Sequence, residues 1–315
     1  MTITTAVVGE GARARTVWEV LGRCHAYDLI GPVHRVPGTP GAPGHAANRR
    51  AWEELLARRD VSLIVLSVAD RGRMELIASA QEAGKAVVVA GPPPLSLAEL
   101  NTLAVGGATR GGRTASPMPM RMLLPTVPEL SRSAWTGSAC GVLTLSRFTP
   151  VQASRAAAET ASDPTGLPAI TRVLAPYVDV VCHLFGHPVA AHFMARGDGT
   201  ATGCVEFESG SLLALAVTLT SAWEHDRLEL MDVTKRVVWE DGHLQVHSPE
   251  GSRLLRLPAP GDLLVSAYAD IAARLGADAP LHLHGPEAGR GVALFLHLLG
   301  DGRRDTDRPL GRLTF

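Results

Sequence analysis

Hydrophobic residues in the first 120 positions form short runs that alternate with helical patterns. The runs Thr4–Val8, Val61–Val68 and Ala86–Ala90 have the length of strands. They are apolar at nearly every position, which is typical of parallel strands covered on both faces. Residues 48–59 and 71–83 instead carry apolar side chains at helical spacing. This alternation predicts β-α-β units with right-handed crossovers and a parallel sheet.

From residue 141 the pattern changes to period-two alternation, which is typical of strands with one buried face. The dipeptides Asp198-Gly199, Ser209-Gly210 and Asp241-Gly242 separate several of these strands as hairpin turns do. An open, mostly antiparallel sheet with a few helices is therefore expected. The strands are predicted at Gly141–Phe148, Ala190–Ala195, Ala201–Phe207, Leu212–Thr220, Arg227–Asp232, Arg236–Glu240, His243–His247 and Leu254–Leu257, and the helices at Ala169–Phe185, Asp262–Leu275 and Pro286–Leu299.

The two patterns together predict an α/β domain over residues 1–120 and an α+β domain over residues 121–315. A chain of 315 residues with 46% hydrophobic and 19% charged residues is globular. The net charge of −1 and the lack of a basic run argue against a nucleic-acid partner. No apolar run reaches about 18 residues and no signal segment is evident, so a cytoplasmic protein without a membrane partner is expected. The four cysteines are scattered, which argues against a disulfide framework or a zinc site.

The most informative motif is Gly9-Glu10-Gly11-Ala12-Arg13-Ala14, directly after the first predicted strand. It fits the G-x-G-x-x-G/A fingerprint of a dinucleotide-binding turn. In this motif Gly9 makes the tight turn, Gly11 lets the backbone approach a pyrophosphate, and Ala14 lets the helix pack close to the strand. The helix N-terminus then offers free N–H groups to the phosphates. The predicted cofactor-binding residues here are Gly9, Gly11, Ala12, Arg13 and Ala14.

Residues Leu29–Val33 are predicted to form the second strand, and the end of this strand bears on the choice of cofactor. NAD-specific proteins place an acidic residue there for the ribose hydroxyls. Here the chain reads Val33-His34-Arg35 and has no acid. Arg35 is suited to a 2′-phosphate, so His34 and Arg35 favour NADP(H) over NAD(H). The alternative is a solvated loop, because the Pro37-Gly38-Thr39-Pro40 segment follows at once.

The order of several short motifs resembles the glucose–fructose oxidoreductase/inositol dehydrogenase (Gfo/Idh/MocA) family over essentially the whole chain. The resemblance implies a Rossmann domain, and a second domain whose open sheet often forms an oligomer interface. It also implies that Ser67, Ala90 and Gly91 lie at the cofactor. The motifs are Ser67-Val68-Ala69-Asp70, Ala83-Gly84-Lys85, Ala90-Gly91-Pro92, Leu95-Ser96-Leu97-Ala98-Glu99, Arg121-Met122-Leu123-Leu124-Pro125, Thr136-Gly137 to Cys140-Gly141, and Tyr177-Val178-Asp179 to Leu184-Phe185-Gly186.

The chain departs from the family pattern at the positions of the family's catalytic residues. The lysine of the family's E-K-P motif is replaced by Gly91, and the D-x-x-x-H helix reads Arg172-Val173-Leu174-Ala175-Pro176. All three polar groups used for alcohol and ketone chemistry are therefore absent. Because proline disfavours a helix interior, the helix is also expected to start late or kink at Pro176.

General acid–base assistance contributes roughly 10²–10⁴ in rate, so carbonyl reduction would be slow without these groups. A protonated imine is already electrophilic and needs less help. The sequence therefore favours an atypical NAD(P)-dependent oxidoreductase that reduces an imine-like or otherwise pre-activated small molecule. The alternatives are a non-redox enzyme, such as a cyclase or lyase, and a catalytically silent binding or scaffold protein.

Other polar residues near the altered helix are further candidates. Tyr177 follows the lost histidine and offers a proton, Asp179 matches a family aspartate that is usually structural, and His183 lies two turns after Pro176. Arg172 is a candidate contact to an acidic substrate, and Arg121 a candidate for a cleft position. For each of these residues the alternative is a side chain that is packed in the core or exposed to solvent and has no role in the site. His282-Leu283-His284 places two imidazoles on one face, but without a third ligand a solvated loop is expected and no metal is predicted.

The sheet domain also predicts assembly. In Leu212-Leu213-Ala214-Leu215-Ala216-Val217 both alternating sets are apolar, so the outward set needs cover. A face-to-face homodimer, or a tetramer of such dimers, would bury it. Leu215 is one of the apolar positions expected to matter for this assembly.

Overall fold

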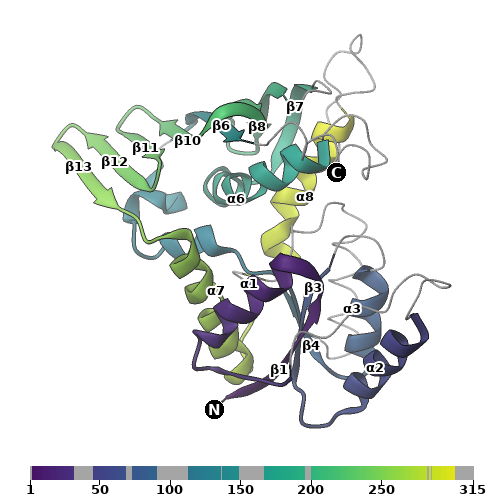
Figure 1. The fold of residues 1–315 in the computed structure, drawn as a ribbon. Helices are drawn as coiled ribbons and strands as arrows, with labels where there is room; N and C mark the ends of the chain where they lie inside the picture. The colour runs from purple at the N-terminus through teal and green to yellow at the C-terminus, as the bar shows by residue number, and fades with distance from the viewer. Residues whose placement is uncertain are drawn as a thin grey trace. The chain divides into compact units, whose positions relative to one another are not determined.

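The structure is a computed structural model that describes residues 2–31, 45–68, 73–90, 113–135, 137–148, 167–195, 200–281, 284 and 286–301 (Figure 1). The chain forms two compact units. The first contains residues 1–119 together with residues 260–290. The second contains residues 120–259 and 291–315.

The first unit is built on a five-stranded sheet in the order β2-β1-β3-β4-β5. Every neighbouring pair is parallel, as the sequence predicts. The strands are β1 (Ile3–Gly9), β2 (Tyr27–Leu29), β3 (Leu63–Ser67), β4 (Ala86–Val89) and β5 (Thr114–Ala115), and the helices between them are α1 (Gly11–Gly22), α2 (His45–Ala57) and α3 (Arg73–Glu82).

Both faces of this sheet are covered, which explains why its strands are apolar throughout. Val7 and Val65 point to one face, where they pack with α1 and with α7 (Pro260–Gly276). Val8 and Ile64 point to the other, where they pack with α2 and α3. Tyr268 of α7 is fully buried in the first cluster, so residues 260–290 belong to this unit. The alternation of strands and helices along the sequence does not predict that residues 260–290 return to the first unit.

The second unit contains an eight-stranded sheet in the order β13-β12-β11-β10-β6-β9-β8-β7. Only the β6–β9 pair is parallel, so the predicted mostly antiparallel sheet is confirmed. No helix in the described part of the chain is long and apolar enough to cross a membrane. The elements are β6 (Cys140–Phe148), α6 (Leu167–Phe185), β7 (Pro188–Ala195), β8 (Thr200–Phe207), β9 (Leu212–Thr218), β10 (Thr220–Met231), β11 (Arg236–Glu240), β12 (His243–Ser248), β13 (Gly251–Arg256) and α8 (Pro286–Asp301), with short 3₁₀ turns η1 (Pro119–Leu123), η2 (Pro128–Leu130) and η3 (Arg132–Ala134).

One face of this second sheet is covered within the chain. The other, which we call the open face, exposes apolar residues in the part of the chain that the structure describes. Helix α6 packs on the covered face, where the Phe185 and Phe207 rings are 5.9 Å apart. Along β9, Leu213, Leu215 and Val217 are buried, while Leu212 and Ala214 are exposed. Leu215 therefore belongs to the internal core of the second unit and is the wrong residue with which to probe an outer interface.

Two turns between these strands bear on the sequence prediction. Asp241 and Gly242 join β11 to β12 with φ values of 45° and 80°, as the predicted hairpin turn requires. Ser209-Gly210 likewise joins the antiparallel strands β8 and β9. Asp198-Gly199 lies outside the described residues.

Candidate functional site

The carboxyl ends of β1 and β3 form the centre of the candidate site. Gly9 ends β1, Ser67 ends β3, and the two residues are partners in the ladder. From β1 the chain proceeds to β2 on one side, and from β3 to β4 on the other. This is the topological switch point at which open α/β sheets bind their ligands.

Close packing at this point requires glycine at position 9. A Cβ on Gly9 would lie 2.4 Å from the Ser67 carbonyl oxygen and 3.0 Å from the Ala14 Cβ. The predicted roles of Gly9 in the turn and of Ala14 in helix–strand packing fit these distances. The side chain of Ala14 is buried, in agreement with this.

Gly11 is required for a different reason. Its φ is +73°, a conformation that other residues rarely adopt. A Cβ there would meet no described atom within 4 Å, so the backbone faces open space. Gly11 is the first residue of α1, and the preceding Glu10 makes no side-chain capping bond. The first N–H groups of α1 are therefore available to an anion.

Ser67 adds a polar group beside Gly9 and Gly11, and we call these three residues the dinucleotide cradle. Its side chain is buried, and its hydroxyl has no hydrogen-bond partner among the described residues. A buried hydroxyl without a partner is costly, which is expected where a ligand supplies the missing contact. The glycine turn, the uncapped helix and this hydroxyl together fit a dinucleotide at the switch point. Ala12 and Arg13 are exposed in the first turn of α1, and Ala90 is buried just beyond β4.

Three predicted cofactor residues lie outside the described part of the chain: His34, Arg35 and Gly91. Their positions therefore do not enter the geometry above. The preference for NADP(H) over NAD(H) rests on the sequence of that segment alone.

Neither lysine in the described residues is free to replace the missing family lysine. Lys85 is buried, and its Nζ donates to the carbonyl oxygens of Arg58 at 2.5 Å and Val61 at 3.0 Å. Lys235 lies in the second unit, where its ammonium group is 4.4 Å from the centroid of the Trp135 ring. Both side chains thus have local structural partners.

In the second unit, Arg121 and Asp179 form a buried ion pair. The Arg121 Nε and Nη2 atoms donate to the Asp179 carboxylate at 2.8–2.9 Å. The two side chains are only 9% and 3% exposed. Burial raises the pKa of Asp179, and the Arg121 guanidinium opposes that shift. The geometry gives Asp179 the structural role that is usual for this family aspartate, and it gives Arg121 the same role.

Tyr177 belongs to a second polar cluster, on the covered face of the sheet. Its hydroxyl donates to Asp226 Oδ2 at 2.5 Å, and Arg147 Nη2 donates to the same oxygen at 2.7 Å. The Tyr177 ring also lies 5.9 Å from that of Trp239. Burial and the neighbouring Asp226 raise the pKa of Tyr177, so this phenol holds its proton. Tyr177 is therefore a weaker proton donor than its sequence position suggests.

The residues that partner Tyr177 are absent from the sequence prediction, although the pattern contains a signal for them. Asp226 stands two positions before the buried Leu228, and Arg147 two positions after the buried Leu145. Both are therefore charged residues on the covered face, where apolar residues are expected. Opposite charges at such positions on neighbouring strands indicate a pair.

Helix α6 begins at Leu167 and continues through Pro176, so it does not start late at the proline. Pro176 is exposed, while Ala175 and Tyr177 on either side are buried. Because the proline lies on the solvent side, the carbonyl that it leaves without a helical donor can be hydrated. Arg172 lies in the same helix, but its side chain is outside the description.

His183 is half-buried in the last turns of α6. Burial lowers its pKa, and the nearby charges of Arg121 and Arg132 lower it further. The folded protein therefore favours the neutral imidazole at a pH where the unfolded chain begins to bind a proton.

This shift predicts a contribution to acid sensitivity. As the pH falls below about 6.5, the ordinary histidine pKa, unfolding takes up a proton at His183 and stability declines. A His183→Gln variant should lose stability less steeply between pH 7 and pH 5, as measured by urea unfolding. Equal slopes for His183→Gln and the parent protein would contradict the assignment.

His284 also differs from its expected place in a solvated loop. It is fully buried, and its Nδ1 accepts a hydrogen bond from the Met118 backbone N–H at 3.1 Å. Its Nε2 lies 3.2 Å from Asp270 Oδ2. His282 is outside the description, and no group of metal-ligating side chains occurs among the residues that the structure covers.

Comparison with solved structures supports the two-domain architecture. UDP-N-acetylglucosamine 3-dehydrogenase GnnA from Acidithiobacillus ferrooxidans aligns with 96% of this chain and 98% of its own, with a TM-score of 0.75 and 17% identity. Aldose-aldose oxidoreductase from Caulobacter crescentus aligns over 99% and 100%, with a TM-score of 0.75 and 13% identity. Levoglucosan dehydrogenase in complex with NADH aligns over 97% and 98%, with a TM-score of 0.70 and 13% identity.

The chain has the fold of the Gfo/Idh/MocA oxidoreductases. No family model and no curated protein matches the sequence. At these identities the likeness establishes the Gfo/Idh/MocA fold, and function has to be argued from the site.

Proposed function

We propose that the protein is a nicotinamide-dinucleotide-dependent oxidoreductase of the Gfo/Idh/MocA type, with NADP(H) favoured over NAD(H). The observation that carries the proposal is the cradle formed by Gly9, Gly11 and Ser67 at the switch point. Solved proteins of the same fold are described with NADH or NAD⁺ bound. A bound nicotinamide supplies hydride chemistry, and this chain supplies the turn, the helix N-terminus and the buried hydroxyl that hold it.

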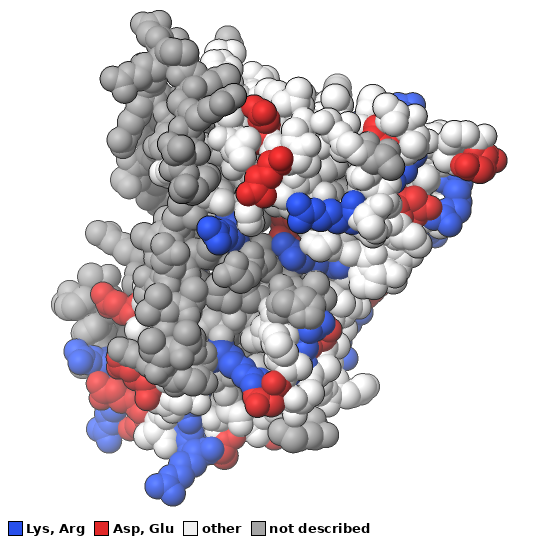
Figure 2. All heavy atoms as spheres, turned by 180° about the vertical axis from the view of Figure 1, so that it is seen from behind, with Lys and Arg blue, Asp and Glu red and all other residues white. Residues whose placement is uncertain are grey.

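The substrate side favours a small molecule that is already activated. Gly91, Arg172 and Pro176 stand where the family resemblance places lysine, aspartate and histidine. The remaining candidates offer little acid–base help: Tyr177 donates to Asp226, and Asp179 is held by Arg121. An imine-like substrate that arrives protonated needs no such group, and it is the substrate class we propose. Acidic and basic side chains are interspersed on the face shown in Figure 2, which favours a small-molecule partner over a nucleic acid.

Cofactor binding provides the direct test. NADPH at 100 times its dissociation constant should stabilise the fold by about 2.7 kcal/mol and raise the melting temperature. Gly11→Asn should abolish that increase, because asparagine tolerates a positive φ while its side chain enters the open space.

In the parent protein, NADP⁺ with inositol or glucose should give no turnover.

A matched control separates the loss of cofactor from backbone strain. Gly84, in the turn between α3 and β4, has a φ of +72°, and a Cβ there would meet no described atom within 4 Å. Gly84→Asn should therefore change the basal melting temperature as Gly11→Asn does, but keep the full response to NADPH. If neither NADPH nor NADH stabilises the parent protein, the proposal is wrong and a non-redox or scaffold function gains support.

A further inference from the structure

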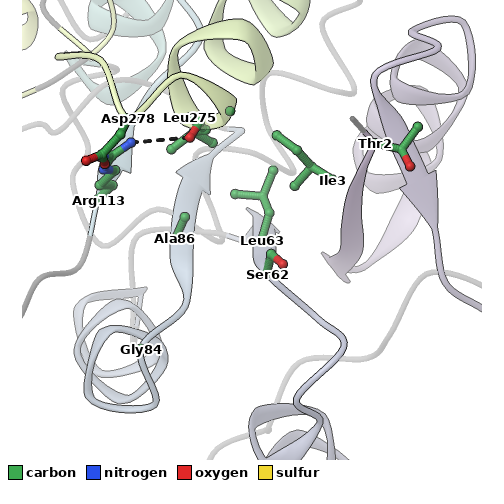
Figure 3. A pocket seen from close by; sticks show the side chains of 10 residues that line it. Thr2, Ile3, Ser62, Leu63, Gly84, Ala86, Arg113, Leu275 and Asp278 are labelled. Carbon is green, nitrogen blue, oxygen red and sulfur yellow. Dashed lines mark hydrogen bonds and ion pairs between the residues drawn. The ribbon is translucent and has the colours of Figure 1, made fainter.

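A pocket of about 260 Å³ is lined by residues at the amino ends of the parallel strands, whereas the dinucleotide cradle lies at their carboxyl ends. Figure 3 shows the side chains that line this pocket. It is formed where β1, β3 and β4 begin, beside the end of α7. Ligands of open α/β sheets bind at the carboxyl ends of the strands. A pocket at the amino ends is therefore separate from the proposed cofactor site and needs an explanation of its own.

The pocket has an apolar side, next to a polar part to which Thr2 and Ser62 contribute. Ile3, Leu63 and Ala86 come from the starts of three neighbouring strands, and Leu275 comes from the last turn of α7 (Figure 3). Leu63 is fully buried and Ile3 is 7% exposed, so the floor is closed by the sheet itself. This apolar side suits a short hydrocarbon chain.

A single cation stands at the rim among the residues that line the pocket. The Arg113 guanidinium pairs with Asp278 and lies 3.4 Å from the carbonyl oxygen of Leu275. Its side chain is 30% exposed, whereas that of Asp278 is 89% exposed. Arg113 is thus fixed against the pocket, while its carboxylate partner extends into solvent.

Asp278 lies in the turn that ends α7. Its φ of 54° is a conformation that aspartate adopts more readily than most residues, and the Ala279 N–H donates to the carbonyl oxygen of Arg274 at 2.8 Å, as in a helix C-terminal cap. An exposed ion pair contributes little to stability, so a competing carboxylate can displace Asp278 at small cost.

We propose that this pocket binds a small carboxylate with a short apolar chain. In this site Arg113 receives the carboxylate by a bidentate contact, and Ile3, Leu63 and Leu275 receive the chain. Asp278 occupies the place of the ligand carboxylate when the pocket is empty, and it is displaced on binding. The proposal is independent of the function proposed for the cradle.

The test is a calorimetric titration of the full chain with butyrate, butyramide and inorganic phosphate. Butyrate should bind, while butyramide, which lacks the charge, and phosphate, which lacks the chain, should bind at least tenfold more weakly. Arg113→Gln should weaken butyrate binding about 10- to 100-fold, because a hydrogen bond to a charged group is lost. Asp278→Asn should strengthen it about two- to fivefold, because the internal competitor is removed.

The two variants should change the affinity for butyrate in opposite directions, which distinguishes a carboxylate site from a simple packing defect. Asparagine tolerates the backbone conformation of Asp278, so this variant remains informative even if Arg113→Gln fails to fold. The proposal is overturned if butyrate gives no heat of binding, if phosphate binds as well as butyrate, or if Asp278→Asn leaves the affinity unchanged. The response to NADPH should persist in both variants, which keeps this test separate from that of the cradle.

Discussion

Replacing Asp179 by asparagine is expected to lower the free energy of unfolding by about 3–5 kcal/mol, the usual loss when one partner of a buried ion pair is removed. The substitution keeps the shape of the side chain but removes the charge that neutralises the buried Arg121 guanidinium. Arg121 and Asp179 are 9% and 3% exposed, so water cannot replace the lost carboxylate. Urea unfolding followed by circular dichroism measures the change.

Two further variants define the cause of this loss. Asp262→Asn removes the same charge from an ion pair with Arg23 in which both side chains are more than half exposed. It should cost less than about 1 kcal/mol. The double variant Arg121→Met/Asp179→Leu replaces the whole pair with apolar groups and should recover much of the stability. If Asp179→Asn lowers the free energy of unfolding by less than about 1 kcal/mol, the ion pair between η1 and α6 contributes no more than an exposed pair does.

The local patterns of the sequence were sufficient to predict most of the regular elements that the structure describes. Strands apolar on both faces and helices between them specify a parallel sheet, and Asp241-Gly242 specifies a tight turn, because each signal depends on neighbouring residues. The Gly9–Ala14 motif is local in the same sense. Its geometric requirements at Gly9 and Gly11 are visible in the structure as a close approach and a positive φ.

Contacts between distant residues could not be predicted in this way. Arg121 and Asp179 are 58 positions apart, and Arg147 and Asp226 are 79 apart, so no spacing rule connects them. The first half of β10 was missed because its ladder with β6 shifts register between Thr220 and His225, which breaks the alternation. The buried face of β9 was ambiguous because both of its alternating sets are apolar.

The open face of the second sheet is proposed to be the dimer interface. Its exposed apolar residues include Val142 on β6 and Leu212 on β9, each 44% exposed, and Met194 on β7, which is 61% exposed. Ala214 lies between them, because it pairs with Val142 on one side and with Cys204 on the other. Contiguous exposed apolar surface of this kind marks an interaction site.

The charged half of this face is suited to being covered. Glu229 on β10 accepts hydrogen bonds from Arg227 at 2.8 Å and from Arg236 at 2.7 Å. These contacts lower the pKa of Glu229. A two-fold dimer places the same patch of each copy against its counterpart. Because Glu229 is already paired with Arg227 and Arg236, this contact does not oppose two patches of the same charge.

An Ala214→Arg substitution should therefore convert the proposed dimer to a monomer. In a two-fold interface the new guanidinium enters twice, and the transfer of each charge out of water costs several kcal/mol. Light scattering at micromolar concentration should fall from the mass of two chains to about 33.2 kDa. The melting curve of the variant should still show a folded protein, since Ala214 is exposed within the subunit. Ala51→Arg, on the exposed side of α2, carries the same change outside the face and should leave the assembly intact. A parent protein that is already monomeric, or an Ala214→Arg variant that remains dimeric, would remove this face as the interface.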